Sequence, residues 1–202
     1  MVGKTISLFP SVFSTLLHAY EKTDFVSFIH HVHMVGSTIF APTNHAFARL
    51  GHRVNAFLFE TERGRHILKE ILKYGVVANT TLYSDAVYGK VERLGGIGRS
   101  THYDLKTLHD DKTIGVDVWR WGALTDIRIN GRGRVVFSDG VAKNGVIQVV
   151  DSVPLPPCPR GGHGHNEYKE MSVEDLVERF GGLAELEGGR GMEPVEIVFE
   201  DL

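Results

Sequence analysis

Imidazole side chains gather in two short stretches of the sequence, and imidazole is a common ligand of zinc, copper and nickel. His30, His31 and His33 form one stretch, and His163 and His165 lie in a second, glycine-rich one. A metal site needs three or four ligands held in fixed positions, whereas the first stretch is expected at the end of a helix, where solvent and the helix dipole already favour histidine. We therefore expect no metal and no cofactor. A metal- or small-ligand-binding protein that uses these histidines is the alternative hypothesis.

Signatures of enzymatic catalysis are missing from the sequence. The single cysteine, Cys158, lies between prolines with no helix N-terminus or base beside it, so nothing indicates an activated thiolate. The sequence contains no G-x-S-x-G elbow and no H-E-x-x-H helix. Its glycine run Leu94–Gly98 lacks the strand and helix that a phosphate-binding loop needs. We expect no catalytic residues and no enzymatic activity.

Arginine and aromatic residues lie close together in one later segment, and they suit binding rather than catalysis. They are Trp119, Trp121, Arg128, Arg132 and Arg134, with Arg120 between the two tryptophans. Guanidinium groups beside aromatic rings suit acidic glycans and acidic peptides. The alternative is that these charges only keep the edge of a hairpin soluble.

Charge and composition narrow the classes of protein to which the 202-residue chain can belong. Apolar residues make up 42% and charged residues 23% of it, as in an ordinary globular protein, and the net charge is −3. This charge argues against a surface built for nucleic acid. No apolar run approaches the roughly 18 residues of a membrane-spanning helix, so no membrane span is expected in this chain.

A segment rich in proline and then glycine, Pro154–His165, divides the chain. Residues 1–157 contain 14 acidic and 18 basic residues, and residues 158–202 contain 11 acidic and 4 basic residues. We therefore expect a domain over 1–157, followed by a linker and an acidic extension over 158–202. Such an acidic tail is expected to dock on the basic core or on a partner.

Helical periodicity dominates the first third of the sequence. Ser11, the pair Thr23-Asp24, and Asn44 can each cap a helix whose apolar residues follow at helical spacing. A further helix is predicted over 63–74. The β-branched segment Thr38–Pro42 predicts a buried strand between them.

Two-residue periodicity replaces the helical pattern in the second half. It predicts strands over residues 114–121, 126–129, 134–137 and 146–150. Asn130-Gly131 predicts a tight hairpin turn, because both residues tolerate a positive φ. Helices followed by antiparallel strands predict an α+β fold, with helices packed on one side of a curled sheet.

The acidic extension also contains periodic segments. Ser172 begins a capping-box pattern, and the apolar stripe after it predicts a short helix over 172–180. Alternation predicts an edge strand over 195–199. A helix this short is marginal on its own, so we expect it to dock on the core or on a partner.

Two segments together resemble the signature boxes of fasciclin I-type domains. The first is Thr38–Phe47, and the second, about one hundred residues later, is Asn144–Pro157; Leu72–Val77 resembles the tyrosine–histidine segment of that family. The resemblance implies a single fasciclin-like domain over 1–157, with helices packed on a curled wedge of mostly antiparallel strands. It also implies that the signature residues hold the fold together, and that the chain is a fungal or microbial surface protein.

The chain departs from the family pattern at three places. Gly75 stands where a histidine usually follows the tyrosine, and Gln148 stands where the closing strand usually has a histidine. Because that histidine normally acts as a hydrogen-bond hub, Gln148 predicts a rearranged interior polar network. Asp139-Gly140 replaces an aspartate–isoleucine pair associated with integrin binding, so integrin recognition is not expected. Tyr74 and Asp139 remain candidate contacts by resemblance.

These observations predict a non-enzymatic adhesion or extracellular interaction module that binds a protein or a glycan through surface loops and one sheet face. The candidate contacts are Tyr74, Trp119, Trp121, Arg128, Arg132, Arg134 and Asp139. A glycosylation sequon begins at Asn79. With the resemblance, the sequon favours an extracellular or cell-surface location, a vacuolar or secretory one being the alternative, although no signal peptide is visible.

Overall fold

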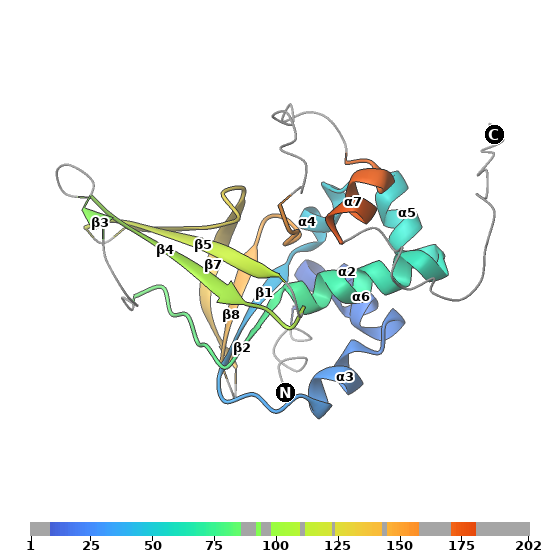
Figure 1. Cartoon of the computed structure of the whole chain (residues 1–202), viewed down its shortest axis with the longest axis horizontal. Helices are drawn as coiled ribbons and strands as arrows, with labels where there is room; N and C mark the ends of the chain where they lie inside the picture. The colour runs from blue at the N-terminus through green and yellow to red at the C-terminus, as the bar shows by residue number, and fades with distance from the viewer. Residues whose placement is uncertain are drawn as a thin grey trace.

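Helices gather on one side of the molecule and strands on the other (Figure 1). The computed structural model describes residues 9–85, 92–93, 98–109, 112–122, 124–142, 145–157 and 171–180. The helices are α2 (Pro10–Lys22), α3 (Phe25–His31), α4 (Asn44–Ala48), α5 (His52–Glu60), α6 (Glu62–Tyr74) and α7 (Val173–Arg179). The strands are β1 (Ser37–Pro42), β2 (Val76–Ala78), β3 (Glu92–Arg93), β4 (Gly98–Lys106), β5 (Thr113–Trp121), β6 (Leu124–Ile129), β7 (Gly133–Ala142) and β8 (Gly145–Val150). The predicted α+β fold is confirmed. None of the described helices is long and apolar enough to cross a membrane.

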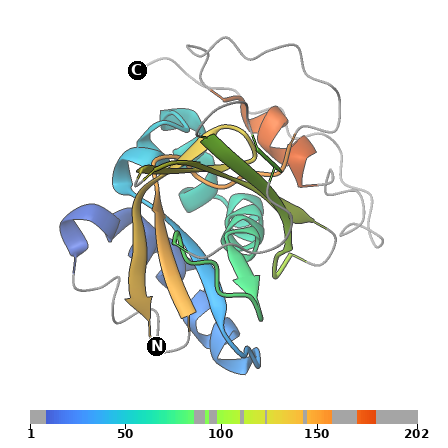
Figure 2. The ribbon, with the colours of Figure 1, turned by 90° about the vertical axis from the view of Figure 1, so that its left-hand side faces the viewer.

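The described strands form one mixed sheet, in the order β2-β1-β8-β7-β6-β5-β4-β3. β1 and β8 run parallel, with Ile39 opposite Ile147 and Phe40 opposite Gln148. All other neighbouring strands are antiparallel. The two segments that resemble signature boxes therefore lie side by side (Figure 2), and the prediction of a mostly antiparallel sheet is confirmed.

Strand β1 is buried along its whole length because both of its faces are covered. Ile39 packs with the buried residues of the helices, whereas Phe40 points to the opposite face and joins Val116, Ile127 and Val150 inside the curl of the sheet. A strand covered on both faces carries a near-continuous apolar sequence.

The sheet curls because β6 and β7 pair over a short distance only. Arg128 lies opposite Arg134 and Ile129 opposite Gly133, and the two strands are not paired beyond these residues. The register between β7 and β8 shifts twice between Val135 and Gly140. Such bulges strengthen twist and bend a strand. In Figure 1 the β4–β5 ribbon accordingly extends away from β1 and β8.

Two predicted helix caps are wrong. The Thr43 hydroxyl, not Asn44, caps α4 by accepting a hydrogen bond from the Ala46 N–H (3.2 Å). The Asn44 amide instead joins α4 to α2, because its Nδ2 donates to the Ser11 carbonyl (3.0 Å) and its Oδ1 accepts from the Thr15 N–H (2.9 Å). Ser11 lies inside α2, which begins at Pro10, since proline is favourable in the first turn.

Four elements, α5, β2, β3 and β4, were not predicted. In α5 only Val54 and Leu58 are buried, and aromatic residues outside this pair obscure the helical period. In β4 the alternation begins directly after a glycine-rich segment, which reads as a loop. Of these elements, α5 contacts α7, and β4 pairs with β5 along its length, so both help to position the surfaces described below.

The described part of the C-terminal extension docks on the core. Ser172 caps α7 by accepting a hydrogen bond from the Asp175 N–H (3.1 Å), and Leu176 is fully buried among core residues. Arg179 donates from Nη1 to the Pro156 carbonyl (2.8 Å). Figure 1 shows α7 at the helical end of the molecule, beside α5. The predicted strand 195–199, Cys158, His163 and His165 lie outside the described residues.

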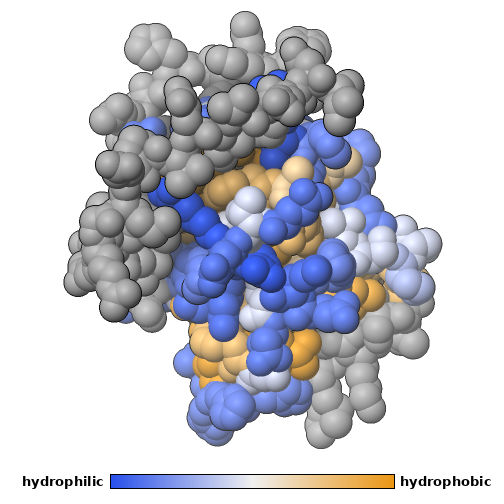
Figure 3. Space-filling view, turned by 90° about the vertical axis from the view of Figure 1, so that its right-hand side faces the viewer, coloured by the Kyte–Doolittle hydropathy of each residue, from blue (hydrophilic) through white to orange (hydrophobic). Residues whose placement is uncertain are grey.

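The helical side of the molecule presents mostly hydrophilic residues where described atoms are visible, with smaller hydrophobic patches between them (Figure 3). Several large apolar side chains are exposed on the strands instead. They are Trp121, Leu124, Val136, Phe137 and Val141.

Candidate partner-binding surface

Strand β5 places its two tryptophans on the outer face of the sheet. Ile114, Val116 and Val118 point into the core, so Trp119 and Trp121 point outward. The two indole rings stack with centroids 6.0 Å apart and an angle of 15° between their planes. Leu124, which is 72% exposed, lies opposite Trp121 on β6 and therefore shares this face. We call Trp119, Trp121 and Leu124 the Trp platform.

Ion pairs flank the Trp platform on the same face. Asp126 lies opposite Trp119 and accepts hydrogen bonds from Nε of Arg134 (2.6 Å) and Nε of Arg128 (3.0 Å). The hydrogen bond from Arg134, with a smaller contribution from Arg128, lowers the pKa of Asp126 below its ordinary value. Since Arg128 and Arg134 lie directly opposite each other, Asp126 also offsets a repulsion between like charges. The platform is thus bordered by charges in a fixed arrangement.

The other arginines of the predicted cluster lie elsewhere. Arg120 points away from the two tryptophans, since neighbouring residues of a strand alternate in direction, and its Nη2 donates to the Ser84 carbonyl (2.7 Å). Arg132, at the β6–β7 turn, lines a separate cavity. The structure thus keeps the tryptophans together with Arg128 and Arg134 and separates Arg132 from them.

A histidine–aspartate pair lies further along the outer face. His102 on β4 lies opposite Asp117 on β5, and its Nδ1 is 2.6 Å from Oδ1 of that carboxylate. Its Nε2 is 3.3 Å from Asp104. The hydrogen bond with Asp117 is the main reason that the pKa of His102 is raised above its ordinary value of 6.5.

The Asp117→Asn variant should therefore lower the pKa of His102 toward its ordinary value. Because the folded-state pKa is raised, the stabilisation from this pair is full below the unfolded-state pKa and is lost as the pH rises through the folded-state pKa. A titration of the His102 ring protons by NMR measures the change. Asp104→Asn, which removes the longer contact, should have the smaller effect, and an unaltered His102 pKa in Asp117→Asn would contradict this geometry.

Tyr74 is fully buried, so its side chain has no surface to offer a partner. Its hydroxyl donates to the Thr113 carbonyl (2.9 Å) and accepts from Nδ2 of Asn130 (2.8 Å). Burial raises the pKa of the phenol above its ordinary value. Asn130, predicted only as a turn residue, also donates to the Leu155 carbonyl (2.9 Å) and accepts from the Gly115 N–H (2.9 Å). Tyr74 and Asn130 thus join α6, β5 and the segment after β8.

Asp139 points inward as well, from a bulge of β7 at which its φ is +61°. Its Oδ1 accepts from the Ser84 N–H (3.0 Å) and from Nε2 of Gln148 (2.9 Å), and its Oδ2 accepts from the Ser84 hydroxyl. Gln148 is fully buried and also donates to the Leu82 carbonyl (2.9 Å). Gln148 thus occupies the centre of an interior polar network that ties segment 82–84 to β7 and β8.

The clustered histidines do not assemble into a metal site in the described part of the chain. His30, His31 and His33 are all exposed at and beyond the end of α3, and no group of three metal-ligating side chains lies together among the described residues. The sequon residue Asn79 is exposed, and its Oδ1 accepts from the Val35 N–H (2.9 Å).

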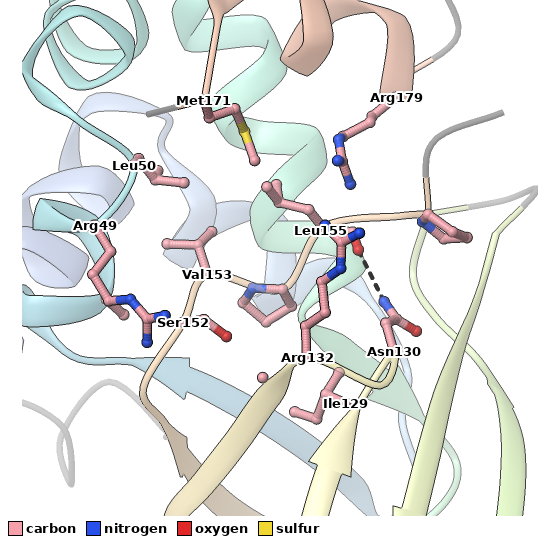
Figure 4. Close-up of a pocket in the computed structure, with 14 residues that line it drawn as sticks. Arg49, Leu50, Ile129, Asn130, Arg132, Ser152, Val153, Leu155, Met171 and Arg179 are labelled. Atoms are coloured by element: carbon pink, nitrogen blue, oxygen red, sulfur yellow. Dashed lines mark hydrogen bonds between the residues drawn. The ribbon is translucent and has the colours of Figure 1, made fainter. Parts of the chain in front are cut away.

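Three arginines around one cavity form a cluster that sequence reasoning did not find. Arg49, Arg132 and Arg179 line a cavity of about 400 Å³ beside the segment after β8 (Figure 4). They come from the end of α4, the β6–β7 turn and α7. The sequence contains one indication of this cluster. Arg179 lies three residues after Leu176, which places a charged residue on the buried side of a short helix.

The curled sheet contains a parallel pair, β1 and β8, and helices cover one side of it, so the fold is a scaffold that presents surfaces. Sequence comparison agrees with this description. The sequence model of the fasciclin domain matches residues 11–156. The chain therefore belongs to the fasciclin domain family, which makes it a module of the cell-adhesion type.

Individual relatives extend this comparison. The chain is 36% identical over 175 residues to "Aurofusarin biosynthesis cluster protein S" of Gibberella zeae, with 73% of this chain and 42% of that protein covered. It is 32% identical over 146 residues to "Protein sll1483" of Synechocystis sp., with 72% and 68% covered. A solved FAS1 domain pair from the insect cell adhesion molecule fasciclin I is 19% identical, with a TM-score of 0.48, and 69% of this chain and 44% of that one are covered. The chain thus spans less than half the length of the fungal relative and of the insect structure.

Proposed function

We propose that the chain is a non-enzymatic interaction module that acts outside the cell or at its surface and binds a glycan through the Trp platform. The observation that carries the proposal is the stacked, outward-facing pair Trp119 and Trp121 beside the exposed Leu124. Large aromatic side chains dominate the binding energy of many recognition surfaces. A sugar ring presents an apolar face and a rim of hydroxyl groups, which suit indole rings and the neighbouring Asp126 ion pairs.

Because of these ion pairs, the outer face of the sheet beside the Trp platform does not require a strongly acidic partner. Asp126 already binds the guanidinium groups of Arg128 and Arg134, so the region next to the platform carries an excess of one positive charge from these three residues. We therefore expect neutral or weakly acidic glycans to bind better than densely sulfated ones. The array experiment described next includes proteins as well as glycans, and a protein that binds the same platform is its other outcome.

The double variant Trp119→Ala/Trp121→Ala should lose binding by at least about 30-fold on a glycan and matrix-protein array, because each ring is expected to act as a hot spot. Val141→Ala is the matched control, since Val141 is 83% exposed on another strand, and it should bind as the parent chain does. Thermal unfolding of the same samples checks that the fold is intact. Unaltered array binding by the double variant would refute the proposal.

A second candidate function rests on the fungal relative and on the arginine-lined cavity. That relative is named for a biosynthesis cluster, and the cavity offers a place for a small molecule. We propose, as this second candidate, that the chain assists enzymes that assemble a small organic compound. The metabolite profile of the source organism without the gene tests it: loss of one compound supports this function, and an unchanged profile contradicts it.

A further inference from the structure

A cavity of about 400 Å³ lies between the β6–β7 turn, α7 and the segment that follows β8. Figure 4 shows Arg132 and Arg179 pointing toward the same space near Leu155, and Arg49 lying on the opposite side near Ser152. The volume falls within the range of small-ligand sites in proteins, about 300–1,000 Å³. The cavity lies apart from the Trp platform, so binding in it is independent of glycan binding at that platform, whereas the second candidate function rests on this same cavity.

Arg179 is the most unusual residue of this cavity. The residue is only 4% exposed, and the one side-chain hydrogen bond that it forms with the described residues runs from Nη1 to the Pro156 carbonyl (2.8 Å). Its Nε is buried without a hydrogen-bond partner, and no carboxylate of the described residues forms an ion pair with it. A guanidinium stays charged when it is buried, so an uncompensated one is costly.

The other two arginines add positive charge to the cavity. Arg132 is exposed and forms no ion pair with the described residues, and Arg49 lies 3.6 Å from Asp151 in a solvent-exposed contact. The outer face of the sheet shows the opposite arrangement, because there Asp126 binds two arginines at once. Among the described residues, no carboxylate balances the charges of Arg132 and Arg179, so the cavity has an excess of positive charge.

Apolar side chains make up much of the remaining wall. Leu50, Val153 and Leu155 line it from the core side, and Met171 points into it from the segment before α7 (Figure 4). A bare inorganic anion would leave these side chains without a partner. We propose that the cavity binds a small organic acid, with its anionic group at Arg132 and Arg179 and an aromatic or short aliphatic body against the apolar wall.

The proposal is tested by isothermal titration calorimetry of the full chain with naphthoic acid, with naphthalenemethanol as the neutral analogue and inorganic sulfate as the bare anion. We expect naphthoate to bind at least about tenfold more tightly than either, because charge-assisted hydrogen bonds and apolar contact act together. Arg132→Gln should weaken naphthoate binding about tenfold or more. Arg63→Gln, which alters an exposed arginine of α6 outside the cavity, should leave it unchanged.

Arg179 anchors α7, so Arg179→Gln is paired with a thermal melt and is interpreted only if the chain stays folded. Equal binding of the neutral analogue, or no effect of Arg132→Gln, would overturn the proposal. A full-length variant with five glutamates of the tail changed to glutamine tests self-occupancy (Glu185, Glu187, Glu193, Glu196 and Glu200). If only this variant binds naphthoate, the acidic tail of the chain is the occupant and the proposal is wrong.

Discussion

Replacing Gln148 by leucine should lower the free energy of unfolding by about 2–4 kcal/mol, since buried polar groups that lose their partners are costly. The Gln148 amide donates to the Leu82 carbonyl and to the Asp139 carboxylate, and its Oε1 accepts from the Asp139 N–H (3.2 Å). Leucine has a similar size and removes all three contacts. Equilibrium unfolding in urea measures the loss.

Gln148→His is the matched variant for this experiment. Histidine can donate one of the two hydrogen bonds, and the family resemblance places a histidine at this position, so we expect it to retain much of the stability that leucine loses. Gln148→Glu should be at least as harmful as leucine, because it places a second carboxylate beside Asp139. A leucine variant as stable as the parent chain would show that the polar network contributes nothing to the fold.

Gly145→Ala should destabilise the fold by about 3 kcal/mol or more, through overpacking and backbone strain. Gly145 begins β8 with a φ of +150°, and a Cβ atom there would lie 2.1 Å from the Ser37 carbonyl oxygen and 2.8 Å from the Ser37 nitrogen. Both are backbone atoms of β1, so the clash can be relieved only by moving β8 away from β1. Thermal or urea unfolding measures the effect.

Gly131→Ala is the control for the effect of conformation alone. Gly131 has a φ of +69° in the β6–β7 turn, but a Cβ atom there would meet nothing within 4 Å. We expect a cost of about 1–2 kcal/mol at this position, which is the usual penalty for a left-handed residue with a side chain. If both alanine variants lost the same stability, the close approach of β8 to β1 would not be what requires glycine at 145.

The sequence predicted those parts of the fold whose periodicity is local. The helix after Thr61 and the strands around the Asn130-Gly131 turn follow from the spacing of their apolar residues. The family resemblance indicates only that the two signature segments are neighbours, and their parallel direction came from the structure, since no local pattern predicts it. The α5 helix was missed because only two of its residues are buried.

The candidate surface was predicted in part. Alternation along β5 was enough to place Trp119 and Trp121 on one face, but it did not reveal that Asp126 would bind Arg128 and Arg134. The direction of the Asp139 side chain depends on a bulge that has no sequence signal of its own. The cavity could not be predicted from the sequence, because its three arginines come from distant parts of the chain that meet only after α7 docks.

Hydroxyl-radical footprinting shows whether the Trp platform is the surface that contacts the partner. The full chain is oxidised alone and in complex with the glycan or protein that the array identifies, and the modification of each side chain is compared by mass spectrometry. We expect Trp119 and Trp121 to become protected in the complex, whereas Val35, which is 73% exposed elsewhere, does not. Protection of other surfaces with both tryptophans oxidised as in the free chain would contradict it.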